Sequence, residues 1–209
     1  MGKITEIRNS KRSKKRVNIY VDGRFALALT TELLIKNKLK VGRELTEEKK
    51  SELLGKDIIE KAMDIALRYL GYRPRSEAEI RTKLLGRGLT EEVTEAIITR
   101  LRDRGLIDDF AFAHFWKDNR ESFNPRSTWL TRRELKQKGV SEEVLNQVID
   151  TETDEASAYQ AALLKARRLT TEDYNVFRKR LGEYLQRRGF GYGVINKTIA
   201  KIWQDLNSA

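Results

Sequence analysis

The sequence predicts a mainly α-helical fold, in which tandem three-helix repeats form an elongated, curved body behind a small N-terminal β-hairpin or β-sheet module. Apolar and polar residues alternate between residues 3 and 29, as strands require. Beyond residue 50, apolar residues recur at helical spacing. Gly88, Gly139 and Gly189 lie 51 and 50 residues apart and are expected to end helices. These observations predict four parts, at residues 1–54, 55–106, 107–152 and 153–209.

The N-terminal module is expected to hold three strands. Residues 17–21 alternate, Asp22-Gly23 has the composition of a tight hairpin turn, and residues 25–29 alternate again. Ile4 and Ile7 supply the third strand. Two short helices are expected next, at about residues 31–38 and 46–54, with Thr46 as the cap of the second.

A strongly basic run separates the first predicted strand from the hairpin. We expect it to be a loop that can reach phosphates or a carboxylate-rich surface, because it is too charged for a core. Its basic residues are Lys11, Arg12, Lys14, Lys15 and Arg16.

The glycines belong to a repeated pattern. A leucine stands four residues before each one, at Leu84, Leu135 and Leu185. Pro-Arg-Ser occurs twice, with Pro74 and Pro125 each 14 residues before a glycine. The recurrence over many positions indicates a true repeat.

Each repeat can be described helix by helix. In the first, a helix through Ile58, Ala62 and Ala66 precedes Pro74. Ser76 then caps a second helix, with Glu79 completing a capping box. That helix ends at Gly88, and Thr90-Glu91-Glu92 opens the third.

The third repeat departs from the pattern. It lacks Pro-Arg-Ser, and Gly191 and Gly193 replace the acidic start of its last helix. Its helices are expected at about residues 154–168, 172–188 and 192–206, with Ile202 and Trp203 closing its core. Since one such unit has little core of its own, stacked units should share buried faces and suit a long partner.

Residues 107–116 are the densest apolar segment. Phe110, Phe112, Phe115 and Trp116 crowd two turns, so we expect this helix to be buried between neighbours. Asp108 is placed to cap it, and Asp109 to favour a helix dipole. The alternative, a metal or acid–base role for the two carboxylates, is less favoured. The structural residues of the repeats are therefore Asp108, Asp109, Phe110, Ala113, Gly88, Gly139 and Gly189.

Composition and charge exclude several classes of protein. No run of 18 apolar residues or secretory signal is present, which favours a cytoplasmic protein without a membrane span. The absence of cysteine excludes disulfides and thiolate ligands, and the lone His114 cannot build a metal site, so no metal or cofactor is expected. The net charge of +11 sits mostly in residues 1–50, which favours contact with nucleic acid or an acidic surface. The alternative is a solvated basic surface.

The sequence resembles the RecX regulatory family. The resemblance rests on Ile-Asp-Asp-Phe-Ala-Phe-Ala at residues 107–113 with Arg120 following, and on Arg75-Ser76-x-x-Glu79-Ile80-x-x-Lys83-Leu84. Residues 16–23 resemble the N-terminal extension of longer members. The similarity covers nearly the whole chain.

The resemblance implies a regulator that binds the RecA filament on single-stranded DNA. We expect a monomer that is not an enzyme, although the sequence does not fix the oligomeric state. Such proteins modulate, and mostly inhibit, strand exchange, ATP hydrolysis and the co-protease activity of the SOS response in DNA repair. Weak non-specific DNA binding is expected. Whether the effect here is inhibition or activation, and whether DNA is contacted directly, stays open.

Basic side chains of the repeats are the candidate filament contacts, because both carboxylates and phosphates suit the guanidinium fork. Arg132 and Lys136 share a helical face. For each residue, a solvated or intramolecular ion pair is the alternative. The candidates are Arg73, Arg75, Arg81, Arg126, Arg132, Arg133, Lys136, Lys138, Arg167, Arg168, Arg178, Arg180, Arg187 and Arg188.

Two alternative functions are open. An autonomous helical DNA-binding module is the main alternative, but Glu91-Glu92 and Glu142-Glu143 at the starts of the third helices oppose groove reading. An enzyme would require distant residues such as Asp108, Asp109 and Glu121 to converge in a pocket. No phosphate loop, dinucleotide fingerprint or hydrolase motif occurs.

Overall fold

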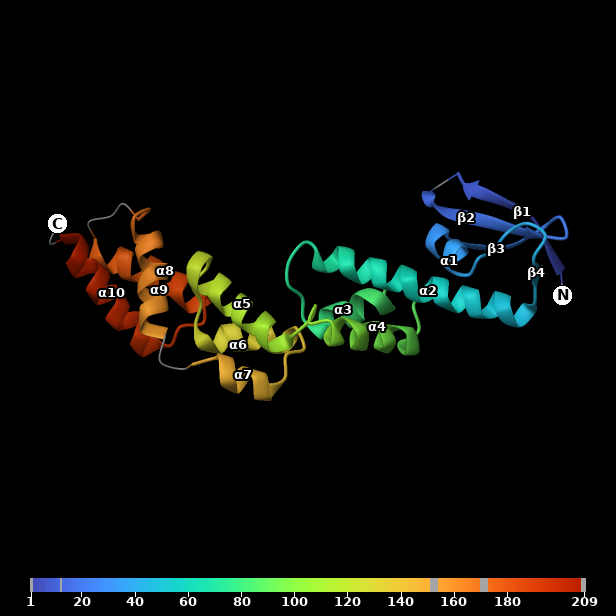
Figure 1. The fold of residues 1–209 in the computed structure, drawn as a ribbon. Helices are drawn as coiled ribbons and strands as arrows, with labels where there is room; N and C mark the ends of the chain where they lie inside the picture. The colour runs from blue at the N-terminus through green and yellow to red at the C-terminus, as the bar shows by residue number, and fades with distance from the viewer. Residues whose placement is uncertain (1, 12, 151–153, 170–172, 208–209) are drawn as a thin grey trace. The chain divides into compact units, whose positions relative to one another are not determined.

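The computed structural model describes residues 2–11, 13–150, 154–169 and 173–207, and Figure 1 shows its ribbon. Over these ranges a small sheet is followed by a succession of helices, so the predicted mainly α fold with an N-terminal β module is confirmed. The chain divides into two compact units: residues 1–72 with 83–100, and residues 73–82 with 101–209. The elongated, curved shape and the bounds of the four predicted parts stay predictions.

The N-terminal sheet is antiparallel with the strand order β3-β2-β1-β4. The strands are β1 (Gly2–Ser10), β2 (Ser13–Val21), β3 (Arg24–Thr30) and β4 (Glu44–Leu45). Asp22 and Gly23 have φ values of 47° and 77°, as the predicted tight turn requires. The alternating apolar residues meet α1 (Thr31–Lys36) and the start of α2 (Glu47–Leu70) in one core, whose buried members include Ile4, Ile19, Leu27, Leu29, Leu33 and Leu53.

The prediction of a basic loop at residues 11–16 was largely wrong. Strand β2 already begins at Ser13, so Lys15 and Arg16 belong to the β1–β2 hairpin. Charged residues are tolerated there because backbone hydrogen bonds form the strand and side chains alternate between its faces. Of the run, Lys11 lies in a turn and Arg12 lies outside the described residues.

The two helices predicted near residues 46–54 and 58–69 are one. Helix α2 begins after the predicted cap Thr46, whose side chain accepts a hydrogen bond from Lys49 N, and continues through Gly55 to Leu70. A single glycine weakens a helix interior by about 1 kcal/mol, which packing outweighs. Ala62 and Ala66 are buried as expected, whereas Ile58 is 42% exposed.

A buried carboxylate fastens the sheet to α2. Asp57 accepts hydrogen bonds from Arg16 Nη2 at 2.9 Å and from Thr30 N at 3.2 Å, and it forms an ion pair with Lys61 at 2.6 Å. Burial raises the pKa of Asp57, but the bonds from Arg16 and Lys61 outweigh it and hold the pKa below its ordinary value. Arg16 is therefore a structural residue.

Helix α3 (Glu77–Leu85) and helix α4 (Glu91–Asp103) follow the predicted pattern of the first repeat. Ser76 Oγ accepts from Glu79 N at 3.2 Å and Glu79 Oε2 accepts from Ser76 N at 3.3 Å, which confirms the capping box. Thr90 Oγ1 caps α4 through Val93 N at 3.4 Å. Gly88 has the positive φ expected of a helix-ending glycine.

The second unit contains two further helix triplets. Helices α5 (Asp109–Phe123), α6 (Thr128–Gln137) and α7 (Glu142–Val148) share a core that includes Phe112, Leu135 and Leu145. Helices α8 (Asp154–Ala166), α9 (Tyr174–Arg187) and α10 (Tyr192–Asn207) enclose a separate core, as predicted for the third repeat. Within it, the Trp203 ring contacts Phe177 at 5.0 Å between centroids.

Helix α5 is less buried than predicted. Asp108 caps it as expected, accepting from Phe110 N at 2.8 Å and Ala111 N at 3.2 Å. Phe112 and Ala113 are buried, but Phe110 is 41% exposed and stacks edge-on against the exposed His114. The aromatic residues therefore occupy more than one face of the helix, and only one face enters the core.

We predict that Asp57→Asn loosens the N-terminal module. The change leaves Arg16 and Lys61 without their anion, and breaking a buried ion pair in this way costs roughly 2–4 kcal/mol. Hydrogen exchange of peptides covering β2 and β3 should accelerate markedly. Glu52→Gln, which removes an exposed ion-paired carboxylate of the same helix, is the matched control and should leave exchange unchanged. Equal exchange in the two variants would contradict the role given to Asp57.

Candidate functional site

Two joints of the same design connect successive helix triplets. We call the first joint the contact of residues 73–79 with residues 138–139. Ser76 Oγ, which caps α3, also donates to the carbonyl oxygen of Lys138 at 2.6 Å. The Lys138 ammonium returns to Glu79 Oε1 at 3.1 Å. These two hydrogen bonds thus connect the N-terminal cap of α3 to the C-terminal end of α6.

The second joint has the same design one repeat later, between residues 124–130 and 188–189. Ser127 caps α6 by accepting from Leu130 N at 3.1 Å, and its own N–H donates to the Arg188 carbonyl at 3.0 Å. The Arg188 guanidinium returns to the Pro125 carbonyl at 2.8 Å and to the Asn124 side chain. The residue before each glycine therefore uses both its carbonyl and its side chain in the joint.

Glycine is required in the joints for two reasons. Gly139 and Gly189 have φ values of 81° and 85°, a region that other residues rarely adopt. In addition, a Cβ at Gly139 would lie 2.3 Å from Ala78 Cβ, and one at Gly189 would lie 2.5 Å from Ser127 Oγ. Gly88, by contrast, has the same backbone conformation with nothing within 4 Å.

A carboxylate of the following helix adds a second cap at each joint. Asp109 Oδ1 accepts from Glu77 N at 2.9 Å, at the start of α3. Asp154 Oδ1 accepts from Thr128 N at 2.7 Å, at the start of α6. Burial raises the pKa of Asp109, and the bond from Glu77 N only partly offsets this. Asp109 lies in the first turn of α5, where it was expected to favour the dipole of that helix, but its hydrogen bond is to the start of α3 in the preceding repeat.

Trp116 and Glu134 form the polar centre beside the first joint. The indole Nε1 donates to Glu134 Oε2 at 2.9 Å, and Arg120 Nε donates to the same oxygen at 2.7 Å. Arg126 binds the other oxygen of Glu134. The cations of Arg73, Arg120 and Lys138 lie 5.7, 4.5 and 4.2 Å from the ring centroid of Trp116. One ring and one carboxylate thus gather basic side chains of three segments.

Glu79 is the other anion of this centre. Burial raises the pKa of its carboxyl, but hydrogen bonds from Arg73 Nη2 at 2.7 Å and from Lys138 prevail and lower the pKa to about 2. Its stabilising effect is therefore fully present above the ordinary carboxyl pKa and is lost as pH falls toward 2.

Five of the predicted contacts are consequently joint residues. Arg73, Arg75 and Lys138 surround Glu79, Arg126 binds Glu134, and Arg188 reaches Pro125. Four of them form the intramolecular ion pairs named as the alternative, whereas Arg188 donates to the Pro125 carbonyl and the Asn124 side chain. Their removal would disturb the fold as well as any surface.

Three further candidates pair within their own repeat while remaining accessible. Arg81 forms an ion pair with Glu77 at 3.6 Å. Arg132 and Lys136, on the shared helical face that was predicted, both bind Glu142, and Lys136 does so with 68% of its side chain exposed. These two cations and the hydrogen bonds they donate hold the pKa of Glu142 below its ordinary value.

The remaining candidates of the repeats are exposed, and the described residues supply no ion pair for them. Arg133 lies over the exposed Trp129 ring at 5.6 Å. The others are all in the third repeat: Arg167, Arg168, Arg178, Arg180 and Arg187. In the N-terminal module, Lys11 and Lys15 are exposed, while the side chains of Arg12 and Lys14 are not described.

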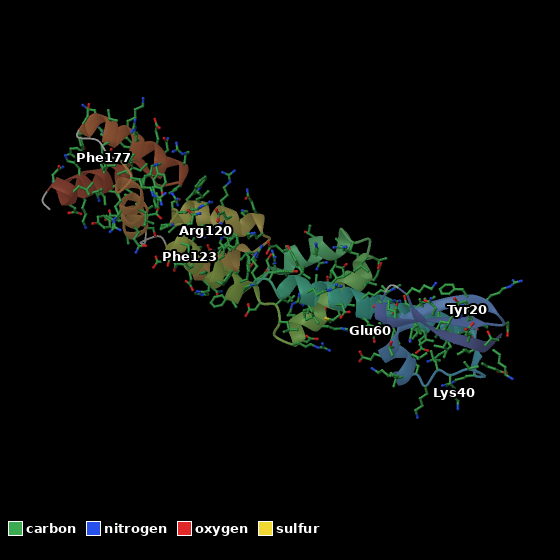
Figure 2. All side chains as sticks on the ribbon, turned by 90° about the horizontal axis from the view of Figure 1, so that it is seen from above. Tyr20, Lys40, Glu60, Arg120, Phe123 and Phe177 are labelled. Carbon is green, nitrogen blue, oxygen red and sulfur yellow. The ribbon has the colours of Figure 1, made fainter. Side chains whose placement is uncertain are left out.

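Exposed aromatic residues are the features that sequence reasoning missed. Tyr72 is 84% exposed, Phe123 is 79% exposed (Figure 2) and Tyr192 is 74% exposed. A signal was present for the first two, because each stands two residues before a proline of the repeat. Tyr192 lies between the two glycines that break the pattern of the third repeat.

Two kinds of feature are absent from the described residues. They contain no group of three or more His, Cys, Asp or Glu side chains able to hold a metal ion. No helix within the described ranges is both long and apolar enough to cross a membrane.

Three segments of the chain match known domain families. Residues 2–46 match the regulatory protein RecX N-terminal domain, residues 62–101 match the RecX first three-helix domain, and residues 152–199 match the RecX third three-helix domain. A regulatory protein RecX from Bacillus velezensis is 30% identical over 94% of this chain and 76% of the relative. One from Clostridioides difficile is 29% identical over 97% and 96%.

Solved structures give the same result. A crystal structure of regulatory protein RecX is 30% identical, covers 94% of this chain and 98% of that chain, and superposes with a TM-score of 0.65. The structure of RecX from Lactobacillus salivarius, at 24% identity and a TM-score of 0.58 over 69% of this chain and 96% of that chain, supports the fold alone.

The glycine joint predicts unequal effects of one substitution at two positions. Gly88→Ala should cost about 1–2 kcal/mol through its positive φ alone. Gly139→Ala adds the clash with Ala78, so its total should reach roughly 3 kcal/mol or more. Urea unfolding followed by tryptophan fluorescence measures both.

Ala78→Gly provides the rescue for this experiment. Placed on Gly139→Ala, it removes the atom that a Cβ at Gly139 would meet, and the double variant should recover part of the loss. A double variant less stable than Gly139→Ala would show that the glycine has no steric role.

Glu79→Gln should weaken the first joint in a pH-dependent manner. At neutral pH the variant should be roughly 1–3 kcal/mol less stable, because Arg73 and Lys138 lose their anion. As pH falls from about 5 toward 2, protonation removes the same charge from the wild type, so the two unfolding midpoints should converge. A difference that stayed constant over this range would assign the effect to side-chain packing.

Proposed function

The chain belongs to the RecX family of regulatory proteins, and we propose on that premise that it binds the RecA filament on single-stranded DNA and mostly inhibits it. The inhibited activities are strand exchange, ATP hydrolysis and the co-protease activity of the SOS response in DNA repair. The protein acts as a monomeric, cytoplasmic binding partner, without catalysis of its own and without a cofactor.

One observation supports the position of the filament-binding surface: several arginines remain exposed because they take no part in the joints. Arg133 of α6 and Arg167, Arg168 and Arg187 of the third repeat present guanidinium groups to solvent. Such groups bind carboxylates and phosphates in bidentate fashion. A nucleoprotein filament offers both kinds of anion, whereas a small-molecule ligand would require a converging pocket.

The autonomous DNA-binding module fits these features less well. Glu91, Glu92, Glu142 and Glu143 are exposed at the starts of α4 and α7. A helix that entered the major groove by this end would bring carboxylates to phosphates. Tight binding to duplex DNA without RecA, with a steep dependence on salt, would support this second function.

The proposal predicts a charge-dependent inhibition of RecA. In a titration of RecA ATP hydrolysis on single-stranded DNA, the wild type should inhibit at or below equal ratios. Arg167→Glu combined with Arg168→Glu should require roughly tenfold more protein, because charge reversal opposes association. Lys36→Glu combined with Lys40→Glu changes net charge equally at exposed residues of the N-terminal module (Lys40 in Figure 2) and should stay within about twofold.

Two results would speak against the proposal. Absence of any effect of the wild type on ATP hydrolysis and strand exchange, across ratios and salts, would reject filament regulation. Equal losses in both double variants would show that net charge matters and that the third repeat is not a specific contact.

A further inference from the structure

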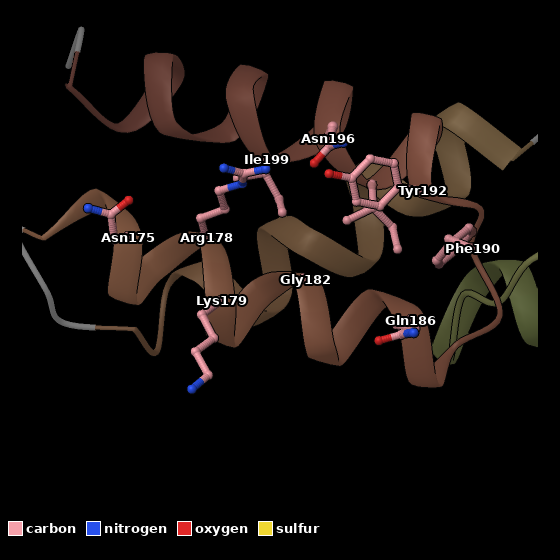
Figure 3. A pocket seen from close by; sticks show the side chains of 10 residues that line it. Asn175, Arg178, Lys179, Gly182, Gln186, Phe190, Tyr192, Asn196 and Ile199 are labelled. Atoms are coloured by element: carbon pink, nitrogen blue, oxygen red, sulfur yellow. The ribbon is translucent and has the colours of Figure 1, made fainter.

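The third repeat contains a groove between α9 and α10 that none of the joints uses. Its volume is about 480 Å³, and it lies within one triplet of helices (Figure 3). Pockets for small ligands or ligand fragments fall in the range of roughly 300–1,000 Å³. The groove is therefore large enough for one nucleotide-sized group.

The charge of the groove is positive. Arg178 and Lys179 are among its lining residues, and none of the described residues that line it is a carboxylate. Arg178 reaches from α9 toward α10, whereas Lys179 points away (Figure 3). The first turn of α10 carries no acidic residue, unlike the first turns of α4 and α7. An anionic ligand would meet no repulsion from these residues.

Tyr192 supplies a fixed aromatic surface at this groove. Asn196 and Arg178 lie beside its hydroxyl, and these two neighbours lower the pKa of the phenol. The side chain nevertheless remains 74% exposed. A ring held at its hydroxyl end and open on its surface is arranged for stacking, and burying it against a ligand would remove an exposed apolar area from water.

The floor of the groove is apolar and is kept open by a glycine. Phe190, Ile195 and Ile199 are buried there. Gly182 lies inside α9, where glycine costs roughly 0.5–1 kcal/mol relative to alanine. An alanine Cβ would meet Ile199 at 3.6 Å, an ordinary contact, so packing does not require the glycine. Its effect is to leave space for a ligand.

We infer that this groove binds one nucleotide of single-stranded DNA, with the base stacked on Tyr192 and the phosphate bound by Arg178. The amide groups of Asn175, Gln186 and Asn196 both donate and accept hydrogen bonds, as base edges do. Sequence-tolerant recognition of single strands uses this combination of an aromatic platform and a cation. An acidic peptide would use the cation but not the open ring with its surrounding amides.

This inference rests on the proposed function, because it names the DNA of the filament as the partner of the third repeat. The test measures binding of the full chain to a fluorescent oligothymidylate by anisotropy at low salt, without RecA. Tyr192→Ala and Arg178→Gln should each weaken binding by roughly tenfold, while Tyr192→Phe, which keeps the ring, should restore most of the affinity. Lys197→Gln removes the same charge from an exposed residue of α10 that pairs with Glu155 and should bind as the wild type does.

A second readout locates the contact directly. Ultraviolet crosslinking to an oligonucleotide that contains iodouracil should place the modified peptide at Tyr192, and Arg178→Gln should reduce its yield. Wild-type affinity in Tyr192→Ala, an equal loss in Lys197→Gln, or crosslinks only outside α9 and α10 would each overturn the inference. Variants that bind DNA normally but fail to inhibit RecA would indicate that the groove binds protein, which also overturns it.

The two proposals can fail separately. If the wild type inhibits RecA while all groove variants bind DNA normally, the proposed function stands and the nucleotide site is wrong. If DNA binding depends on Tyr192 but RecA is unaffected, the nucleotide site stands and filament regulation is wrong.

Discussion

The contact between a capping serine and the end of a helix in the following repeat is the interaction on which the second unit depends. Ser76 and Ser127 each satisfy the start of their own helix and also bind the residue before a glycine about 60 positions later. The glycine makes this possible, because its positive φ turns the chain and its missing Cβ admits the neighbouring helix. The serines that cap helices within one repeat thereby also connect that repeat to the next.

This constraint divides the basic residues into two groups. Lys138 and Arg188 precede the joint glycines and turn their cations back into the preceding repeat, and Arg73 and Arg126 neutralise Glu79 and Glu134. The second group faces solvent: it comprises Arg133 of α6 and five arginines of the third repeat, Arg167, Arg168, Arg178, Arg180 and Arg187. The repeats thus present fewer exposed cations than their composition indicates.

Much of the fold could be predicted because its signals are local. Alternation predicted the strands, capping residues predicted the helix starts, and the repeated glycines predicted the helix ends. The sequence could not show which side chains form ion pairs, because their partners are distant along the chain. Glu79 lies 59 residues from Lys138, and Asp57 lies 41 residues from Arg16. Phe110 was misjudged for a related reason, since helical periodicity does not say which face meets a neighbour. The break in the repeat at Gly191-Tyr192-Gly193 was noticed, but only the structure showed the groove beside it.

The division of the arginines is tested most directly by chemical footprinting with phenylglyoxal, on the free chain and on the chain bound to RecA filaments on single-stranded DNA. The account predicts that Arg133, Arg167, Arg168 and Arg187 react readily in the free chain and become protected in the complex. Arg73 and Arg126 should react slowly in both states. Protection confined to the N-terminal module, or unchanged reactivity of the exposed arginines on binding, would contradict it.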